Sequence, residues 1–268
     1  MIYIIITAVL CFILYALYEN LIMLSVRREK LGEGVKIAHI SDLHKRSFGD
    51  GNSRICDKIR SEKPDLIFIS GDFVSRDETD FSEAEKTLRK LCSAAPVYMI
   101  FGNHEQSIPT EISGDFIAML GKTEVILLRN DKAEVNINGR ELKIFGLEES
   151  YNTYKKNGSY RNLDKLALSD VERLLGKCPE GEVFLLAHNP LSGEIYSHWG
   201  ADCVFSGHVH GGAVRIPFTG KGVLSPERKF FPVYSKGVYN IGKTKLLVSG
   251  GLGKLRLFNP PEIVIYEL

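Results

Sequence analysis

The sequence predicts an α/β protein in which mixed β-sheets are covered by helices. In the first half of the chain, short apolar runs alternate with stretches of helical periodicity, which is typical of strands joined by helices. In the second half, turn signals between short apolar runs indicate hairpins. We expect an N-terminal apolar segment (residues 1–26), a linker (27–34) and one domain (35–268).

The strands are predicted from short runs rich in aliphatic and β-branched residues. In chain order we expect them over residues 35–40, 66–70, 97–101, 124–128, 133–137, 141–145, 182–187, 203–206, 246–249 and 263–266, with further short strands within 223–239. Asn138-Gly139 separates two of these runs and is a strong signal for a two-residue hairpin turn.

The helices are predicted from apolar residues at helical spacing, over residues 54–63, 82–92, 112–120 and 163–175. The first of them ends before Pro64, which disfavours helical backbone in the residue that precedes it. Ser82, with Glu85 three residues later, predicts a capping box at the start of the second.

The N-terminal segment is apolar and uncharged from Ile2 to Tyr18, apart from Thr7. At about 1.5 Å per residue, a helix of this length is near the short limit for a bilayer span. The alternatives are a cleaved signal peptide and a buried core helix. No basic residue precedes the apolar run and no A-x-A pattern follows it, so we expect an uncleaved single-pass anchor that contacts membrane lipid.

The orientation of this anchor is predicted from the basic residues around it. Arg27, Arg28 and Lys30 follow the apolar segment, and no Lys or Arg precedes it. Because basic residues favour the cytoplasmic side of a membrane, we expect the catalytic domain on the cytoplasmic face.

The composition excludes some function classes. The 34 basic and 33 acidic residues give a net charge of +1, so the chain lacks the basic excess that nucleic-acid binding usually requires. Five cysteines form no C-x-x-C pair, which argues against a disulfide framework and against a structural zinc site held by thiolates.

Five polar segments stand out because each ends or follows an apolar run. They are Ser41-Asp42-Leu43-His44, Gly71-Asp72, Gly102-Asn103-His104-Glu105, His188 and Gly207-His208-Val209-His210-Gly211-Gly212. Ligands of α/β proteins gather outside the carboxyl ends of the strands. We therefore expect these side chains to enter one shared crevice.

The spacing within the segments favours a metal site. Asp42 and His44 are two residues apart, as are His208 and His210, and in extended chain such residues point to the same side. The candidate metal ligands are Asp42, His44, Asp72, Asn103, His188, His208 and His210. Carboxylate, amide oxygen and imidazole together suit manganese, iron, zinc or cobalt better than magnesium or calcium. Two such ions held close together are a known means of cleaving phosphate esters.

Each segment taken alone has an ordinary structural explanation. A single D-x-H is common, Gly-Asp after a strand is usually a turn, and His188 could be a buried histidine with satisfied hydrogen bonds. The conjunction of all five, in order and at predicted strand ends, favours a site.

The order D-x-H, G-D, G-N-H-E, H and G-H-x-H resembles that of the calcineurin-like metallophosphoesterases, from about residue 35 to the C-terminus. Gly251-Leu252-Gly253, Arg256 and Pro260-Pro261-Glu262-Ile263 look like the membrane-anchored bacterial branch of that family. One departure is Ser75, where many members have an acidic residue that is not a ligand.

The resemblance implies a four-layer α/β/β/α sandwich with two mixed sheets and a pair of divalent metal ions, manganese being favoured. It implies that Asp42, His44 and His210 hold one ion, that Asn103, His188 and His208 hold the other, and that Asp72 bridges them. It also implies that His104 is not a ligand but a catalytic residue that contacts the phosphate and protonates the leaving oxygen.

These expectations describe a phosphoesterase that cleaves a phosphodiester or pyrophosphate with a hydroxide bridging the two metals. The anchor makes a lipid-linked or envelope-precursor phosphate a reasonable substrate class. The alternatives are a phosphomonoesterase or phosphoprotein phosphatase, and an inactive membrane-tethered binding module on the same fold.

Three surface clusters have open interpretations. Lys45 and Arg46 could meet substrate phosphate or be solvated charges. The polar stretch that contains Tyr151, Tyr154 and Tyr160 with Lys155, Lys156 and Arg161 is part of a substrate wall, a segment near lipid headgroups or, as we expect, a solvated loop. Residues 228–231 are a membrane contact or, again as we expect, an ordinary loop.

Overall fold

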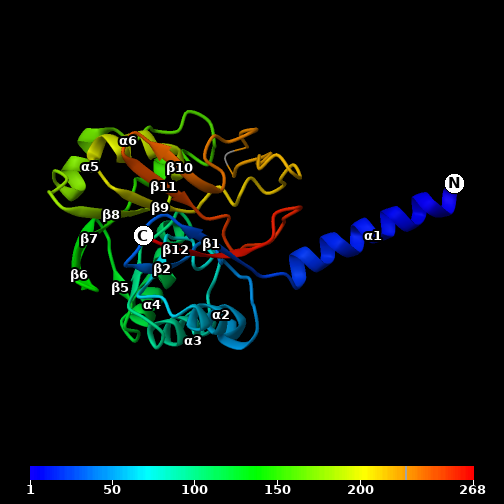
Figure 1. Cartoon of the computed structure of the whole chain (residues 1–268), viewed down its shortest axis with the longest axis horizontal. Helices are drawn as coiled ribbons and strands as arrows, with labels where there is room; N and C mark the ends of the chain where they lie inside the picture. The colour runs from blue at the N-terminus through cyan, green and yellow to red at the C-terminus, as the bar shows by residue number, and fades with distance from the viewer. Residues whose placement is uncertain (227) are drawn as a thin grey trace.

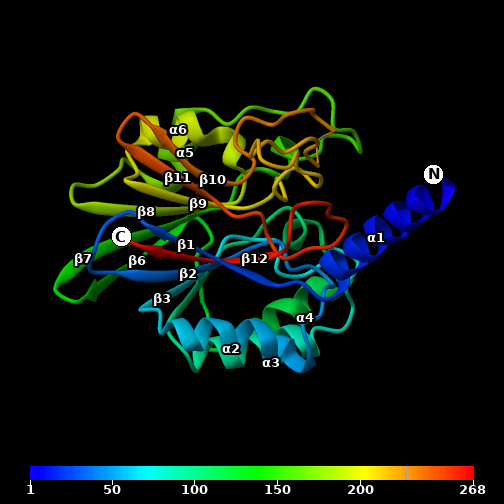
Figure 2. The same ribbon diagram turned by 45° about the vertical axis from the view of Figure 1, so that its right-hand side comes forward.

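The computed structural model describes residues 1–226 and 228–268 (Figure 1). Two six-stranded mixed sheets pack face to face, and helices cover both outer faces (Figure 2). The helices over one sheet are α2 (Ser53–Glu62), α3 (Ser82–Cys92) and α4 (Thr110–Leu120), and those over the other are α5 (Leu168–Leu175) and α6 (Gly193–Trp199). The predicted α/β/β/α sandwich is confirmed.

The first sheet contains strands from both ends of the domain. Its order is β1 (Ser25–Lys30), β12 (Glu262–Glu267), β2 (Lys36–Ile40), β3 (Leu66–Ile69), β4 (Val97–Met99) and β5 (Ile126–Leu127). All neighbours are parallel except β12 and β2. The carboxyl ends of β2, β3 and β4 therefore lie together at one edge of the sheet.

The second sheet has the order β10 (Gly237–Ile241), β11 (Thr244–Val248), β9 (Cys203–Ser206), β8 (Glu182–Ala187), β7 (Arg140–Leu147) and β6 (Asp131–Ile137). The two terminal pairs are antiparallel and the four central strands are parallel. Asn138 and Gly139 join β6 to β7 with φ angles of 52° and 84°, so the predicted hairpin turn is confirmed.

The core between the two sheets is aromatic. Phe68 of β3 meets Phe205 of β9 edge to face with ring centroids 4.8 Å apart, and Tyr266 of β12 lies 5.7 Å from Phe205. All three side chains are fully buried. Such pairs add stability beyond the burial of apolar area, about 0.5–1.5 kcal/mol each. They hold the two sheets, and hence their strand ends, in a fixed relation.

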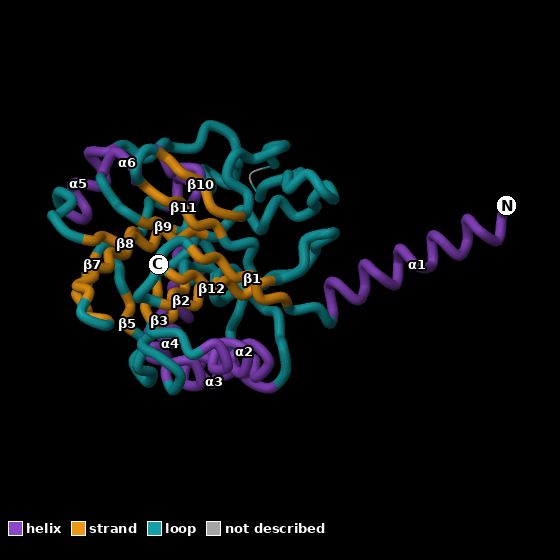
Figure 3. Tube along the Cα trace, viewed as in Figure 1, coloured by secondary structure: helices purple, strands orange, loops and turns teal. Residues whose placement is uncertain are grey.

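The N-terminal helix α1 (Ile2–Leu21) projects from the domain (Figure 3). Its apolar side chains are exposed. Among the described residues it is the one helix long and apolar enough to span a bilayer. Length and composition are shared by a membrane anchor and a signal sequence, so on these criteria alone the helix fits either.

The structure differs from the sequence-based expectations in four elements. Residues 25–30, which lie largely in the expected linker, form strand β1, because they pair in register with β12. The predicted helix over 163–175 begins only at Leu168, and α6 was not predicted. The predicted capping box at Ser82 is wrong. Ser82 is already the first helical residue, and its backbone N–H donates to Asp80 Oδ1 at 2.9 Å.

Candidate metal centre

All seven candidate ligands lie just beyond the carboxyl ends of strands that are parallel neighbours. Asp42 and His44 follow β2, Asp72 follows β3 and Asn103 follows β4, while His188 follows β8 and His208 and His210 follow β9. Because the two sheets pack face to face, their strand ends deliver these side chains to one crevice from two sides. The seven side chains are thus close enough together to belong to one site, as the sequence predicts.

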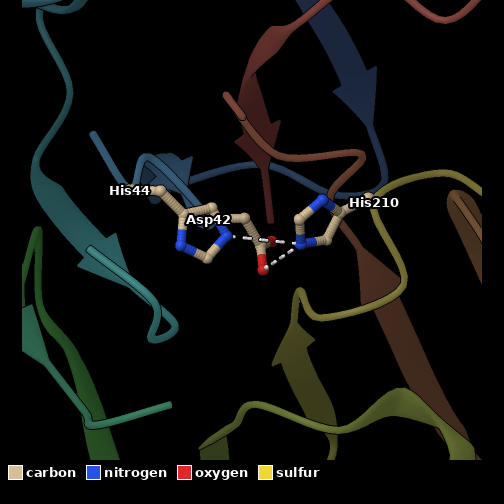
Figure 4. A group of neighbouring side chains, drawn as sticks. All are labelled: Asp42, His44 and His210. Atoms are coloured by element: carbon tan, nitrogen blue, oxygen red, sulfur yellow. Dashed lines mark hydrogen bonds and ion pairs between the residues drawn. The ribbon is translucent and has the colours of Figure 1, made fainter. Parts of the chain in front are cut away.

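The first group of side chains consists of Asp42, His44 and His210 (Figure 4). Asp42 Oδ1 lies 3.4 Å from His210 Nε2, and the Nε2 atoms of His44 and His210 are also 3.4 Å apart. Asp42 is fully buried, whereas the two histidines are partly exposed. Three donor atoms so close together fit a single cation.

The second group consists of Asp72, His188 and His208, with Asn103 beside it. His188 Nε2 lies 3.3 Å from Asp72 Oδ2 and 3.2 Å from Asn103 Oδ1. His188 Nδ1 is 2.7 Å from the backbone oxygen of Ser70, which fixes this nitrogen as a donor and turns Nε2 towards the carboxylate and the amide.

Asp72 lies between the two groups. Its Oδ2 is 3.3 Å from His188 Nε2 and 4.0 Å from His44 Nε2. Asp72, His44 and His104 also form a group whose donor atoms lie within 4.8 Å of one another. Asp72 therefore lies close to side chains of both groups, and the donor atoms fit two cations. Their assignment as ligands remains a prediction.

Backbone hydrogen bonds hold the carboxylates in place. The His208 N–H donates to both oxygens of Asp42, at 3.0 and 3.1 Å, and the His104 N–H donates to Asp72 Oδ1 at 2.7 Å. Buried Glu105 accepts from the backbone N–H groups of Asp72, Val74 and Gly102, at 2.8–2.9 Å. Glu105 therefore ties together the two loops that carry Asp72 and Asn103.

The backbone around the site is strained. Asp42, His44, Asp72, His208 and His210 all have φ between 52° and 65°, a region that residues other than glycine rarely adopt. Such conformations persist where the surrounding structure enforces them and cluster at functional sites.

The electrostatics of the second group favour a bound cation. Burial disfavours a charged His188, but the Asp72 carboxylate outweighs burial and raises the pKa of His188 to about 10. Burial likewise opposes ionisation of Asp72, yet His188 and His44 hold its pKa well below the usual range. The space between these residues therefore prefers a positive charge, which a metal ion would supply in place of a proton.

His44 and His104 are neutral in this environment. Burial lowers the pKa of His44 to about 3, with Asp72 opposing the shift. Burial also lowers the pKa of His104 to about 4, and Asp72 again opposes it while Arg76 adds to it. Neutral imidazole is the form that binds a transition metal or donates a hydrogen bond from one nitrogen.

A cavity of about 120 Å³ opens beside the two groups. It is lined by Asp72, Arg76, Asn103, His104, Tyr151, Tyr154, Lys155, Tyr160, His208, His210 and Pro226. The tyrosine-rich stretch, for which a solvated loop was expected, thus forms a wall of the site. That expectation is wrong because Tyr154 is buried against His188 and His208, with ring centroids 5.8 and 5.0 Å apart.

Arg76 is a cavity residue that sequence reasoning missed. Its backbone N–H donates to His104 Nδ1 at 3.3 Å, and its guanidinium donates to the Tyr151 hydroxyl at 3.2 Å. The signal in the sequence was its position four residues after Asp72, in the same loop. A cation there can meet the oxygens of a phosphoryl group.

Lys45 and Arg46, which were open candidates for substrate contact, have other partners. Lys45 is exposed and forms an ion pair with Asp77 at 2.8 Å. Arg46 is buried, donates to the Gly253 carbonyl at 2.9 Å and lies 4.5 Å from the centre of the Phe48 ring. Neither residue lines the cavity beside the two groups.

The chain is similar to known sequences over most of its length. The sequence model of the calcineurin-like phosphoesterase family matches residues 35–212. The chain is 29% identical over 242 residues to phosphodiesterase YaeI of Escherichia coli (strain K12), covering 87% of this chain and 82% of the relative. It is 27% identical over 285 residues to UDP-2,3-diacylglucosamine pyrophosphatase LpxG of Chlamydia muridarum, covering 87% and 83%.

Among solved structures, the protein TT1561 of Thermus thermophilus covers 82% of this chain and 90% of its own, with 12% identity and a TM-score of 0.46.

Proposed function

The chain belongs to the calcineurin-like phosphoesterase family, and from that premise we propose that it hydrolyses a phosphodiester or pyrophosphate bond with two divalent metal ions. The coarser activity, metal-dependent hydrolysis of a phosphoric ester, follows from the family and its relatives. The observation that carries the finer proposal is the division of the donor atoms into two groups with Asp72 between them.

The donor set supports a transition metal in both positions. Each group combines carboxylate oxygen with imidazole nitrogen, and Asn103 adds an amide oxygen. We propose manganese, with iron, zinc or cobalt as the alternatives that the same ligands accept. When bound, such a pair activates water as the nucleophile and neutralises charge on the phosphoryl oxygens.

The chain's own residues supply the proton and orient the phosphate. His104 Nδ1 accepts a hydrogen bond from the Arg76 N–H, so the proton of the neutral ring resides on Nε2. We propose that the bound phosphate anion raises the pKa of His104, so that the ring acts from its imidazolium form. Nε2 then gives its proton to the leaving oxygen, and the neutral ring that remains regains a proton from water. The Arg76 guanidinium, positioned by the Tyr151 hydroxyl, is proposed to bind a phosphoryl oxygen.

A lipid-linked or envelope-precursor phosphate is the proposed substrate class. Two relatives act on diesters or pyrophosphates by name, and the second of these names denotes an acylated nucleotide sugar. The cavity is narrow and walled by tyrosines, which suits one phosphoryl group better than the flat surface of a phosphoprotein. α1 would hold the site close to membrane substrates.

The contacts of α1 favour a retained anchor over a cleaved signal peptide. Glu19 is fully buried and accepts hydrogen bonds from the backbone N–H groups of Phe258 and Asn259. Asn20 donates to the Arg256 carbonyl at 2.6 Å and accepts from the Arg256 N–H at 2.9 Å. Cleavage after the helix would remove these hydrogen bonds from the domain.

The cytoplasmic orientation remains a prediction. Each residue of the basic cluster behind it has an acidic partner: Arg27 pairs with Glu262, Arg28 with Glu62 and Lys30 with Glu33. The cluster is therefore largely neutralised within the domain and gives the orientation little support.

The test is hydrolysis of bis(p-nitrophenyl) phosphate by the full-length chain in detergent with Mn²⁺, with bound metal measured by elemental analysis. Asp72→Asn is expected to lose metal and to reduce hydrolysis to near background, because its carboxylate serves both groups. Asp57→Asn, an exposed position on α2, is the matched control and should change neither reading. Full metal content and rate in Asp72→Asn would refute the two-metal proposal.

The same assay separates the alternative activities. Faster turnover of p-nitrophenyl phosphate or of a phosphopeptide than of the diester would favour a phosphomonoesterase or a phosphoprotein phosphatase. Bound metal with no turnover of any of the three would favour a binding module.

A further inference from the structure

The loop over residues 253–259 packs against the side of α1. The Phe258 ring stacks on Tyr15 with centroids 5.5 Å apart and meets Phe12 at 6.2 Å. Phe12 and Tyr15 belong to the apolar part of α1, one to two helical turns before its polar end at Glu19. The loop therefore lies beside the apolar part of α1 and not beyond its polar end.

The apolar part of α1 is no longer than the hydrocarbon core of a bilayer is thick, so all of it is needed to cross the membrane. The uncharged stretch from Ile2 to Tyr18 would extend about 26 Å as a helix, less than the roughly 30 Å of a bilayer's hydrocarbon core. If α1 crosses the bilayer, Phe12 and Tyr15 are in the membrane, and the loop that touches them must enter it too.

Residues 256–259 of the loop have internal partners for their backbone N–H groups. The N–H groups of Arg256, Phe258 and Asn259 donate to the side chains of Asn20 and Glu19. The Leu257 N–H donates to the Ala213 carbonyl at 3.3 Å, and the Leu257 carbonyl accepts from the Arg215 N–H at 3.0 Å. Irregular backbone at membrane depth requires such internal partners.

Exposed apolar side chains continue around this loop. The apolar rim, as we call it, consists of Ile216, Phe218, Phe230, Phe231, Val233 and Leu255, with exposures from 38% for Ile216 to complete exposure for Phe218. Its segments, orange to red in Figures 1 and 2, lie on the side of the domain from which α1 projects. A patch of this kind on a soluble surface marks a contact with another phase or molecule.

The charges within the rim match an anionic surface. Residues 213–233 contain four basic side chains, Arg215, Lys221, Arg228 and Lys229, against one acidic side chain, Glu227, which lies outside the described residues. Lys221, Arg228 and Lys229 are exposed. Basic residues near a membrane surface are attracted to anionic headgroups.

We propose that the apolar rim and the loop 253–259 insert into a lipid bilayer that carries anionic headgroups, beside the anchor. This inference rests on the proposed function as an anchored phosphoesterase. The bilayer is the partner that it adds to the proposed site. The segment that precedes Phe230 and Phe231 adjoins the cavity. Pro226 lines the cavity, and Arg228 lies 5.9 Å from the ring of Tyr160, which also lines it. The mouth of the site is thereby held at the bilayer surface, where a lipid-linked phosphate enters without leaving the membrane.

The test places a tryptophan on the rim. Full-length Phe218→Trp is reconstituted into phosphatidylcholine vesicles with phosphatidylglycerol, and its emission is compared with that in vesicles of brominated phosphatidylcholine. Insertion predicts at least about a twofold loss of the added emission. The matched control is Ile126→Trp, a half-exposed position on β5 at the far side of the domain, whose added emission should be unaffected. The native Trp199 is buried and is subtracted as background.

Equal emission of Phe218→Trp in the two kinds of vesicle would overturn the inference, whether or not the protein hydrolyses phosphoesters. Conversely, quenching of Phe218→Trp in a chain without hydrolase activity would sustain the membrane contact while the proposed function fails. Quenching that is several-fold weaker in vesicles without phosphatidylglycerol is the expected signature of the basic side chains.

A second measurement tests whether the rim affects access of substrate to the site. Phe218→Ser/Phe231→Ser is expected to keep the rate on soluble bis(p-nitrophenyl) phosphate but to lose about tenfold or more on a diester embedded in vesicles. Ile117→Ser/Ile126→Ser, exposed apolar positions on α4 and β5, should keep both rates. An unchanged rate on the embedded diester in the rim variant would contradict the role of the rim in substrate access.

Discussion

His104 differs from the other histidines of the site in what surrounds its ring. Its Nδ1 is occupied by the Arg76 N–H, and its backbone N–H is held by Asp72 Oδ1. The ring lines the cavity and lies 4.4 Å from that of His44, centroid to centroid. The ring therefore lines the same cavity as the candidate ligands Asp72 and Asn103, which is the placement that a general acid needs.

His104→Ala should retain both metals but lose activity by about 10²–10⁴-fold in kcat. The loss should shrink for diesters with a good leaving group, because a stable leaving anion needs no proton. Elemental analysis and kcat for p-nitrophenyl and alkyl esters are the measurements. His198→Ala, an exposed position on α6, is the control. An equal loss for all leaving groups would contradict the acid role.

At the residue scale, the sequence predicts the candidate ligands better than it predicts the residues that hold them in position. The seven ligand candidates were identifiable because each follows an apolar run and combines with the others into one chemistry. Arg76 was not identified, and Glu105 was part of the G-N-H-E segment without a role. The hydrogen bonds of both residues involve backbone N–H groups that only the folded loops bring within reach. A charged residue in a loop has no pattern that distinguishes it from a solvated one.

The loops after β3 and β4 approach so closely that they exclude any side chain at Gly102. A Cβ at this position would lie 2.6 Å from the Asp72 nitrogen and would overlap Asp72 Oδ1. Gly114 in α4 is the opposite case, since a Cβ there would meet nothing within 4 Å.

Gly102→Ala is accordingly expected to displace Asp72, to lower metal content and to reduce hydrolysis to near background. Gly114→Ala is the matched control. It should leave activity unchanged and raise stability by up to about 1 kcal/mol, because alanine favours helix over glycine. Metal analysis, turnover of the diester and urea denaturation give the three readings. Normal metal content in Gly102→Ala would show that the loops can move apart.

Strand β12 carries a buried carboxylate, that of Glu262, whose partners lie on other segments of the chain. Glu262 pairs with Lys236 at 2.8 Å and with Arg27 at 3.2 Å, and it accepts from the Gly250 N–H at 2.9 Å. Burial opposes its ionisation, but the two cations outweigh burial and lower the pKa of Glu262 from 4.5 to about 2. A depressed carboxylate pKa stabilises the fold above the unfolded pKa, and this contribution is lost as the pH falls.

Glu262→Gln should therefore lower the free energy of unfolding at pH 7 by about 3 kcal/mol. The difference from the parent should shrink between pH 5 and pH 2, where Glu262 of the parent takes up its proton. Urea denaturation of metal-free proteins at several pH values measures it. Glu141→Gln, an exposed position on β7, is the control. A difference that stays constant down to pH 2 would exclude the ionised carboxylate as its origin.

At the element scale, strands with continuous apolar runs were predicted to within a few residues, as for β3 and β8. β1 was not, because its sequence, Ser-Val-Arg-Arg-Glu-Lys, is polar and highly charged. Its strand conformation comes from pairing with β12, in which Ser25 lies opposite Glu262, at the other end of the domain sequence. Local propensity gives no indication of such a long-range partner.

At the scale of the whole molecule, Arg27 of β1 links the two sheets. Its guanidinium pairs with Glu262 in the first sheet and donates to the Val248 carbonyl of β11 in the second, at 3.1 Å. The sequence could predict the strands but not which faces meet, because the pairing of two sheets depends on tertiary contacts. A domain boundary at residue 35 follows from apolar content alone and leaves this strand out.

A chain of residues 35–268 should consequently be less stable than one of residues 24–268. It lacks β1, leaves β12 as an open edge and deprives buried Glu262 of Arg27. Loss of one partner of a buried pair costs about 3–5 kcal/mol, which corresponds to a fall in Tm of roughly 10 °C at this size. The open edge also favours aggregation.

Thermal unfolding and size-exclusion chromatography of the two chains test this boundary. Arg27→Met in residues 24–268 separates the two causes, because it keeps the strand but removes the ion pair. It should lower Tm without promoting aggregation, whereas the shorter chain should show both effects, since only it exposes the N–H and C=O groups of β12. Equal Tm and equal monomer content for residues 35–268 and 24–268 would mean that β1 is a linker, as its charged sequence first indicated.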